Sequence, residues 1–169
     1  MKNLYLKTVL FLFALTLVNC TKSDDQDQLP PITQTGANTF GCVINGEVLI
    51  PKNGFGVPQP KGLNIGRKPD GNLYISSSNL QDDNGLYVYI YINNLTSTGT
   101  YNIGLSKGLS INLFNPNFPH IFCTGNNNGQ RNVYYSNVNS GTITITRFDP
   151  INHIASGTFQ LTVFNKDNP

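Results

Sequence analysis

The run Leu86-Tyr87-Val88-Tyr89-Ile90-Tyr91-Ile92 decides the fold, because it is the strongest strand signal in the chain. β-Branched and aromatic residues favour strands, and side chains two positions apart share one face of a strand. One face of this run is therefore aliphatic and the other consists of tyrosines. We expect a β-strand whose aliphatic face fills a core.

Segments with the same period of two, separated by turn signals, extend on both sides of this run. Asn45-Gly46 is the pair that most readily forms a type I′ hairpin turn, and Lys68-Pro69-Asp70-Gly71 fits a type I turn. Residues 51–62 and 115–131 are rich in Gly, Pro and Asn and predict loops, the second one long and irregular. The further strands are predicted at 39–44, 47–50, 63–67, 72–78, 100–105, 109–114, 133–136, 141–148 and 154–164.

This pattern predicts an all-β domain, either an antiparallel β-sandwich or a small open barrel of about 8–10 strands. No segment shows a convincing helical period. The sequence alone does not separate the sandwich from the barrel.

The N-terminus has the composition of a cleavable export signal. Lys2 and Lys7 flank the start of an apolar run at 9–18, which is shorter than the roughly 20 residues that a transmembrane helix needs. A basic start followed by a short apolar run is typical of a secretory signal peptide. We therefore expect residues 1–19 to be removed.

Leu17-Val18-Asn19-Cys20 resembles a lipobox, the cleavage site of bacterial lipoproteins. The resemblance implies that the Cys20 thiol receives diacylglycerol and its freed amine a further acyl chain such as palmitate, and two or more chains anchor a protein stably. The alternative is a plain secreted protein that is cut nearby. No other cofactor is expected.

The segment after Cys20 predicts a flexible tether, 20–38, ahead of a single domain at 39–169. Thr21 to Gln28 holds no apolar residue and cannot offset the entropy of ordering its backbone. Its Ser, Lys and Asp residues also resemble the signal that sends lipoproteins of the Bacteroidota to the outer face of the outer membrane. The alternative is that the segment is a spacer without a targeting signal. The alternative location of the domain is the periplasmic face of the outer membrane.

Charge argues against nucleic acid as a partner. Removal of Lys2 and Lys7 leaves nine basic and nine acidic side chains, and the basic ones are scattered along the sequence. Nucleic-acid binding needs a clustered basic surface. The membrane, through the lipid anchor, and a glycan or a surface protein remain as partners.

Apart from the acylated Cys20, Cys42 and Cys123 are the two cysteines of the mature chain. Since the protein folds in an oxidising compartment, we expect a disulfide between them. It would close a loop of 81 residues, worth about 4–5 kcal/mol in the chain-entropy model. Two free buried thiols are the alternative.

The sequence nominates no catalytic or metal site. The serine-hydrolase elbow, the phosphate loop and the zinc-protease helix are absent, and His120 and His153 are expected to be surface loop residues. Asp82-Asp83-Asn84-Gly85 reads as a turn rather than a calcium loop. We therefore expect a protein that is not an enzyme; a hydrolase would require Asp149, His153 or Glu47 to converge in one cleft.

The tyrosine face of the 86–92 run is the feature most open to a functional interpretation. Exposed Tyr87, Tyr89 and Tyr91 could stack on sugars or contact a protein partner. The alternative is that another layer, or cross-strand neighbours such as Tyr74 and Tyr101, covers them. A lipocalin-like carrier would instead show a closed barrel with an apolar cavity.

Turn and strand motifs in three regions resemble a family of small Bacteroidota lipoproteins of unknown function. They are Thr35-Gly36-Ala37-Asn38-Thr39-Phe40-Gly41-Cys42, Gly99-Thr100-Tyr101-Asn102-Ile103-Gly104 and the late Ser-Gly-Thr segments at 140–145 and 156–159. The resemblance implies a fold and a cell-surface location, and it implies no catalytic residue. The sequence thus predicts a surface lipoprotein with a structural or binding role.

Overall fold

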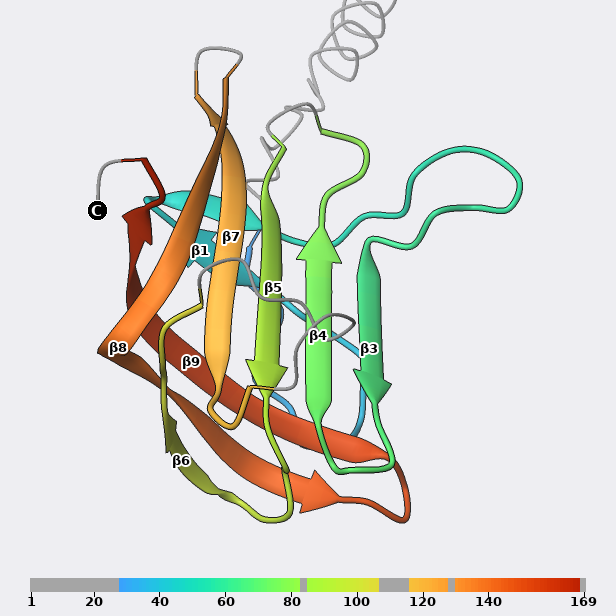
Figure 1. The fold of residues 1–169 in the computed structure, drawn as a ribbon. Helices are drawn as coiled ribbons and strands as arrows, with labels where there is room; N and C mark the ends of the chain where they lie inside the picture. Colours follow the sequence, from blue (N-terminus) through green and yellow to red (C-terminus); the bar gives the residue numbers. More distant parts are fainter. Residues whose placement is uncertain (1–27, 83–84, 107–115, 128–129, 168–169) are drawn as a thin grey trace, which may run out of the picture.

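The computed structural model describes residues 28–82, 85–106, 116–127 and 130–167, and its regular elements are all β-strands. Figure 1 shows them in chain order. The strands are β1 (Cys42–Ile44), β2 (Glu47–Leu49), β3 (Leu63–Arg67), β4 (Leu73–Ser78), β5 (Tyr87–Ile92), β6 (Gly99–Asn102), β7 (His120–Asn127), β8 (Gln130–Asp149) and β9 (Ile154–Asn165).

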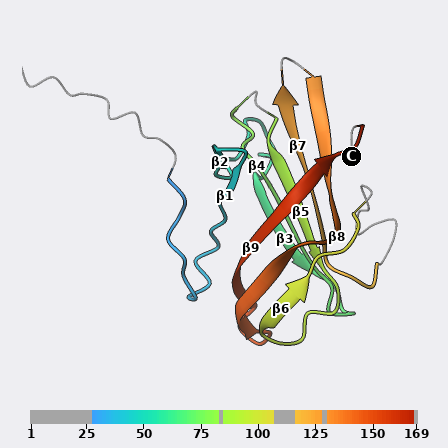
Figure 2. The same cartoon turned by 90° about the vertical axis from the view of Figure 1, so that its left-hand side faces the viewer.

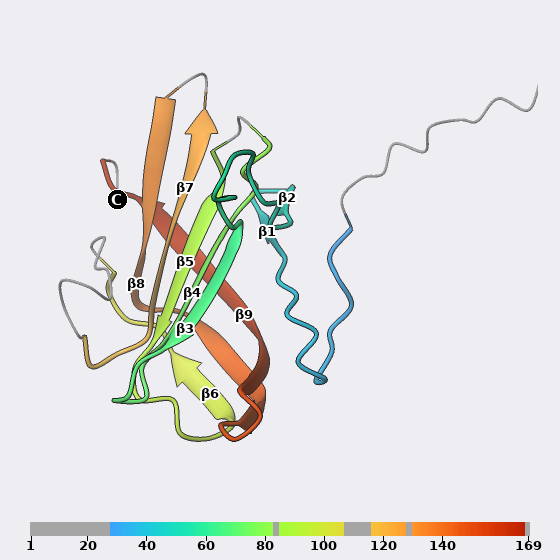
Figure 3. The same ribbon diagram turned by 90° about the vertical axis from the view of Figure 1, so that its right-hand side faces the viewer.

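All strand pairs are antiparallel, and the main sheet has the order β3-β4-β5-β7-β8-β6, with β9 on the other edge of β8. β1 and β2 form a separate hairpin. The sheet stays open, so the all-β prediction is confirmed in the form of a sandwich rather than a closed barrel. In Figure 1, β9 runs obliquely behind the lower ends of β5 and β4, and the side views of Figures 2 and 3 show it with the second half of β8 as a second layer.

The aliphatic core lies between these two layers. Val88, Ile90 and Ile92 of β5 pack there with residues from all the other strands except β3. The buried members from the other elements are Cys42, Leu49, Leu73, Leu95, Ile103, Ile121, Cys123, Ile143 and Ile145. The alternation of 86–92 therefore places its aliphatic side in the core, as predicted.

β8 belongs to both layers because it bends in the middle. Its first part pairs with β7, its later part pairs with β6, and β9 follows its other edge. The register shifts at the bend: residues 137–140 of β8 stand against the single residue Thr162 of β9. Asn139 has a positive φ of 58° there, a conformation that Asn tolerates better than most residues.

Ser136 fixes this bend from inside. Its fully buried hydroxyl accepts a hydrogen bond from the Ile121 amide at 3.1 Å and donates one to the Gly104 carbonyl at 2.8 Å. The segment 103–106 thereby fills the gap that opens between β7 and β6, where Ile103 and Ser106 also bond to the β8 backbone. One side chain holds three segments together.

The predicted turns are confirmed where the structure describes them. Asn45 and Gly46 have φ angles of 50° and 90°, as a type I′ turn requires. In the next turn, the Gly71 amide bonds to the Lys68 carbonyl at 2.9 Å.

The prediction of one irregular loop over 115–131 is wrong, because β7 occupies its centre. Ile121 and Cys123 face the aliphatic core, whereas Phe122 and Thr124 face the other way. The prolines at 116 and 119 precede the strand, and the Gly/Asn cluster lies at its far end, so neither interrupts the sheet. The predicted strands 133–136 and 141–148 are parts of one strand, β8, and the predicted strand 109–114 lies outside the described residues.

Candidate binding surface

Tyr87, Tyr89 and Tyr91 point away from the aliphatic core, as their alternation requires, but they do not form an exposed row. The exposed fractions of Tyr89 and Tyr91 are 5% and 0%, and Tyr87 is half-buried. They pack in a second, aromatic cluster with Tyr74 and Phe122. The prediction of a binding face made of three exposed tyrosines on β5 is therefore wrong, and the alternative, that neighbouring side chains cover them, holds.

Neighbouring strands and the connection before β7 cover these rings. Tyr91 stacks on His120 with ring centroids 5.0 Å apart, and its hydroxyl donates to the Pro116 carbonyl at 3.2 Å. Burial raises the pKa of the Tyr91 hydroxyl, with Asp70 adding to the shift. His120, expected at the surface, is fully buried here.

Tyr74 covers the cluster from the side of β3. A Cβ on Gly66 would collide with the Tyr74 ring, so the ring lies across the strand at the one position that has no side chain. The expectation that Tyr74 is a cross-strand neighbour is thus confirmed. Tyr101 packs against the aliphatic core instead.

Four aromatic residues lie opposite one another across the outer face, and we call them the aromatic row: Tyr89, Phe122, Tyr135 and Phe164. Tyr89 and Phe122 stack with centroids 5.1 Å apart. Exposure rises along the row, from the buried Tyr89 through half-buried Phe122 and Tyr135 to Phe164, which is 38% exposed. The row therefore opens to solvent over β8 and β9.

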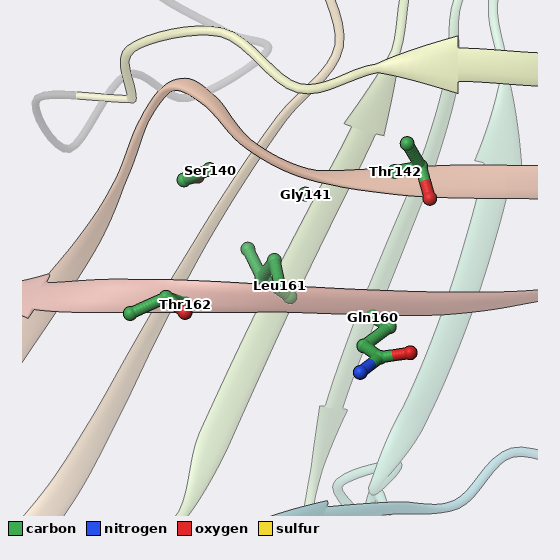
Figure 4. A pocket seen from close by; sticks show the side chains of 6 residues that line it. All are labelled: Ser140, Gly141, Thr142, Gln160, Leu161 and Thr162. Carbon is green, nitrogen blue, oxygen red and sulfur yellow. The ribbon is translucent and has the colours of Figure 1, made fainter.

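A shallow hollow of about 320 Å³ lies between β8 and β9, at the bend of β8 (Figure 4). It forms where β8 bows away from Thr162. The hollow is lined by Ser140, Gly141, Thr142, Gln160, Leu161 and Thr162. Its side chains are uncharged, and most carry a hydroxyl or an amide.

Two side chains of the hollow, Gln160 and Thr162, lie on the same face of β9 as Phe164 at the exposed end of the aromatic row. β9 has no bulge of its own, so Gln160, Thr162 and Phe164 alternate with Phe159, Leu161 and Val163, which pack against the aliphatic core. At about 3.4 Å per residue, Gln160 lies roughly 14 Å along the strand from Phe164. The exposed end of the aromatic row and the hydroxyl-lined hollow therefore follow one another along the same face of β9, before and after the bend of β8.

The polar groups of the hollow are open to a ligand. Within the described residues, the side chains of Thr142, Gln160 and Thr162 make no hydrogen bond, whereas the Ser140 hydroxyl accepts one from the Asn137 amide at 3.0 Å. Hydroxyls and a carboxamide can both donate and accept, but they do not titrate near neutral pH. This chemistry suits recognition of an uncharged polar molecule rather than acid–base catalysis.

The carboxylates considered for catalysis have structural surroundings. Asp149 accepts hydrogen bonds from the backbone amide and side-chain amide of Asn152, at 3.0 and 2.8 Å. These bonds, with the Arg147 guanidinium at 3.3 Å, lower the pKa of Asp149 to about 2. His153 follows in the same turn with a φ of 57°, and Glu47 is exposed on β2. No hydrogen bond or ion pair within the described residues joins Glu47 to Asp149 or His153.

No group of three His, Cys, Asp or Glu side chains that could hold a metal ion occurs among the residues that the structure places. In the segment 82–85, for which a turn was predicted rather than a calcium loop, Asp83 and Asn84 lie outside the described residues.

Cys42 and Cys123 are free thiols in the structure, both buried in the aliphatic core. The expected disulfide is therefore not formed here. Burial raises the pKa of Cys42 to about 12, with Cys123 adding to the shift, and burial raises the pKa of Cys123 to about 11. A charge on either thiol would be poorly solvated, which keeps both protonated near neutral pH.

Comparison with known proteins adds no relative: no family model, curated protein or solved structure matches this chain. The described residues contain no helix with the length and apolar character needed to cross a bilayer. The aromatic row and the hollow therefore rest on the geometry of this chain alone.

Replacing Tyr91 by Ala should lower the free energy of unfolding by about 3–5 kcal/mol, because a fully buried ring leaves a cavity. Phe164→Thr, on the exposed end of the same face, should cost much less. Urea unfolding followed by circular dichroism measures both, and the joint replacement of Tyr87, Tyr89 and Tyr91 by Ser should not fold. A loss below about 1 kcal/mol for Tyr91→Ala would show that the ring is not core.

The two thiols make the stability of the reduced protein depend on pH. Their pKa values are raised from 9.0 on folding, so the unfolded state releases these protons first and unfolding becomes easier as the pH rises above 9 toward 12. Below pH 9 the contribution is constant. In this window the free energy of unfolding of the reduced protein should fall with pH more steeply than that of the Cys42→Ala/Cys123→Ala variant. Identical pH profiles of the two proteins would contradict the burial of the thiols.

Proposed function

We propose that this chain is an exported, lipid-anchored binding module without catalytic activity, which holds glycans on the outer surface of β8 and β9. The observation that carries the proposal is the continuity of the aromatic row with the hydroxyl-lined hollow. The anchor comes from the sequence, and the binding surface comes from the fold.

The proposed membrane attachment depends on Cys20, which lies outside the described residues. The lipobox-like segment, the polar tether and the resemblance to Bacteroidota lipoproteins together support attachment to the outer membrane with the domain toward the exterior. Residues 28–38 form no strand or helix and are mostly exposed, and the Gln34 carbonyl accepts a hydrogen bond from Arg147.

Glycan binding fits the chemistry of the surface. Aromatic rings offer a flat apolar area that stacks on the C–H face of a sugar ring, and Tyr adds a polar tip. The hydroxyls of Thr142 and Thr162 and the amide of Gln160 supply donors and acceptors for sugar hydroxyls. The platform sits on paired strands, which hold it in place without a large ordering cost on binding.

The architecture favours this proposal over a lipocalin-like carrier. Such a carrier needs a closed barrel around an apolar cavity, whereas this sheet is open and its hollow is polar and lies at the surface. A protein ligand on the same surface remains an outcome that the binding experiment below can reveal.

In the oxidising compartment, we propose that Cys42 and Cys123 join into a disulfide that links β1 to β7. Both side chains are buried in the same core cluster. The bond would attach the small hairpin to the main sheet.

The lipid anchor predicts that cells fed labelled palmitate transfer label to the wild-type protein and not to Cys20→Ala, because the variant lacks the attachment thiol. Cys42→Ala serves as the matched control and should stay labelled. Label on Cys20→Ala at the wild-type level would remove Cys20 as the anchor.

The binding surface predicts that replacing Tyr135 and Phe164 by Thr weakens glycan binding about tenfold or more, since such a loss corresponds to about 1.4 kcal/mol. Affinity electrophoresis in gels containing xyloglucan, β-glucan, mannan or starch measures the binding. Val43→Thr/Ile151→Thr, which removes exposed apolar side chains elsewhere, should bind like wild type. If the wild-type protein is retarded in none of these gels, or if the Tyr135/Phe164 variant is retarded equally, the glycan surface is wrong.

A further inference from the structure

The loop between β2 and β3 presents two apolar side chains to solvent. Phe55 is 82% exposed and Val57 is fully exposed, and neither belongs to the aliphatic or the aromatic cluster. We call residues 53–60 the loop tip. In Figure 1 the loop extends beyond the sheet beside the start of β3.

Hydrogen bonds hold this loop in a closed shape. The Gly54 amide donates to the Pro60 carbonyl at 3.0 Å, and the Gln59 side-chain amide donates to the Gly54 carbonyl at 3.1 Å. At the base, the Gly62 amide bonds to the Asn53 side chain at 3.0 Å. The loop tip is therefore built to hold its shape.

The base of the loop is also tied to the neighbouring strand. The Lys52 amide donates to the Ser78 carbonyl at 3.2 Å, and the Leu80 amide donates to the Lys52 carbonyl at 2.9 Å. A Cβ on Gly54 would touch Pro60 and Leu80, so this glycine allows the two arms to pack against each other. Ordering costs on binding would be small because the loop is already shaped.

The distribution of charge around the loop tip is the next feature that bears on its partner. Residues 53–60 carry no charge, and Lys52 and Lys61 stand directly on either side. Aromatic and aliphatic side chains enter the boundary between headgroups and acyl chains, while a flanking lysine such as Lys61 reaches the headgroups. Anionic lipids attract such a lysine.

We infer that the loop tip docks onto the membrane that carries the lipid anchor, with Phe55 and Val57 entering an anionic lipid surface. This inference rests on the lipid anchoring proposed above. The chain contacts the domain from Gln34 onward, where the Arg147 side chain bonds to the Gln34 carbonyl. The stretch from Cys20 to Gln34 can extend to about 50 Å, so the anchor alone fixes neither the distance of the domain from the membrane nor its orientation. Because the tether keeps the membrane at high effective concentration, a small apolar tip suffices to fix one orientation.

The absence of tryptophan from the chain allows a direct test. Phe55→Trp places a single fluorescent reporter at the loop tip, and Ile151→Trp places one at the exposed turn between β8 and β9 as the matched control. Each acylated full-length mature protein is reconstituted into vesicles of phosphatidylethanolamine and phosphatidylglycerol, with and without lipids brominated in their acyl chains. Mass spectrometry of the purified protein establishes acylation separately.

With acylation confirmed, the F55W variant should emit at shorter wavelength on vesicles and be quenched by the brominated lipids, and the I151W variant should show neither effect. Vesicles in which phosphatidylcholine replaces phosphatidylglycerol should quench F55W less. Unchanged emission of F55W, or equal quenching of both variants, would overturn the inference. An emission shift that depends on protein concentration without vesicles would assign the tip to a second copy of the chain and also overturn it. A protein that is not acylated would instead defeat the anchor proposal.

Discussion

The burial of β5 on both faces is the constraint on which the rest of the structure depends. Val88, Ile90 and Ile92 complete the aliphatic core, while Tyr89 and Tyr91 complete the aromatic cluster. A shift of one residue in the pairing with β4 or β7 would exchange the two sets, placing hydroxyl-bearing rings in the aliphatic core. The register of the central strands is therefore fixed from both sides, and the aromatic side chains of β7, β8 and β9 follow it into one row.

The bend of β8 shapes the outer surface that we propose binds glycans. Ser136 holds the bend by bonding to β7 and to the segment before it, so the strand can leave one layer and enter the other. The same bend opens the hollow opposite Thr162, and it keeps Tyr135 and Phe164 at the rim of the outer face. The platform and the hollow are thus consequences of one backbone feature.

Local patterns in the sequence predicted the elements whose signals are contiguous. Asn45-Gly46 identified the first hairpin, and the alternation in 86–92 identified both faces of β5. β7 was missed because the surrounding Pro, Gly and Asn residues outweigh the short alternation of Ile121, Phe122 and Cys123. The burial of Tyr91 was beyond local reasoning, since it depends on Pro116 and His120. The hollow also had no sequence signal, because a bulge in a long strand resembles a break between two strands.

Native-state hydrogen exchange of the backbone amides tests the central role of β5 most directly. If both of its faces are core, the hydrogen-bonded amides of Val88 to Tyr91 should exchange only when the whole domain unfolds, with the free energy of global unfolding. Amides of the loop tip at 53–60 and of residues 28–38 should exchange much faster. Exchange of the β5 amides by local opening, at free energies well below that of global unfolding, would contradict the account.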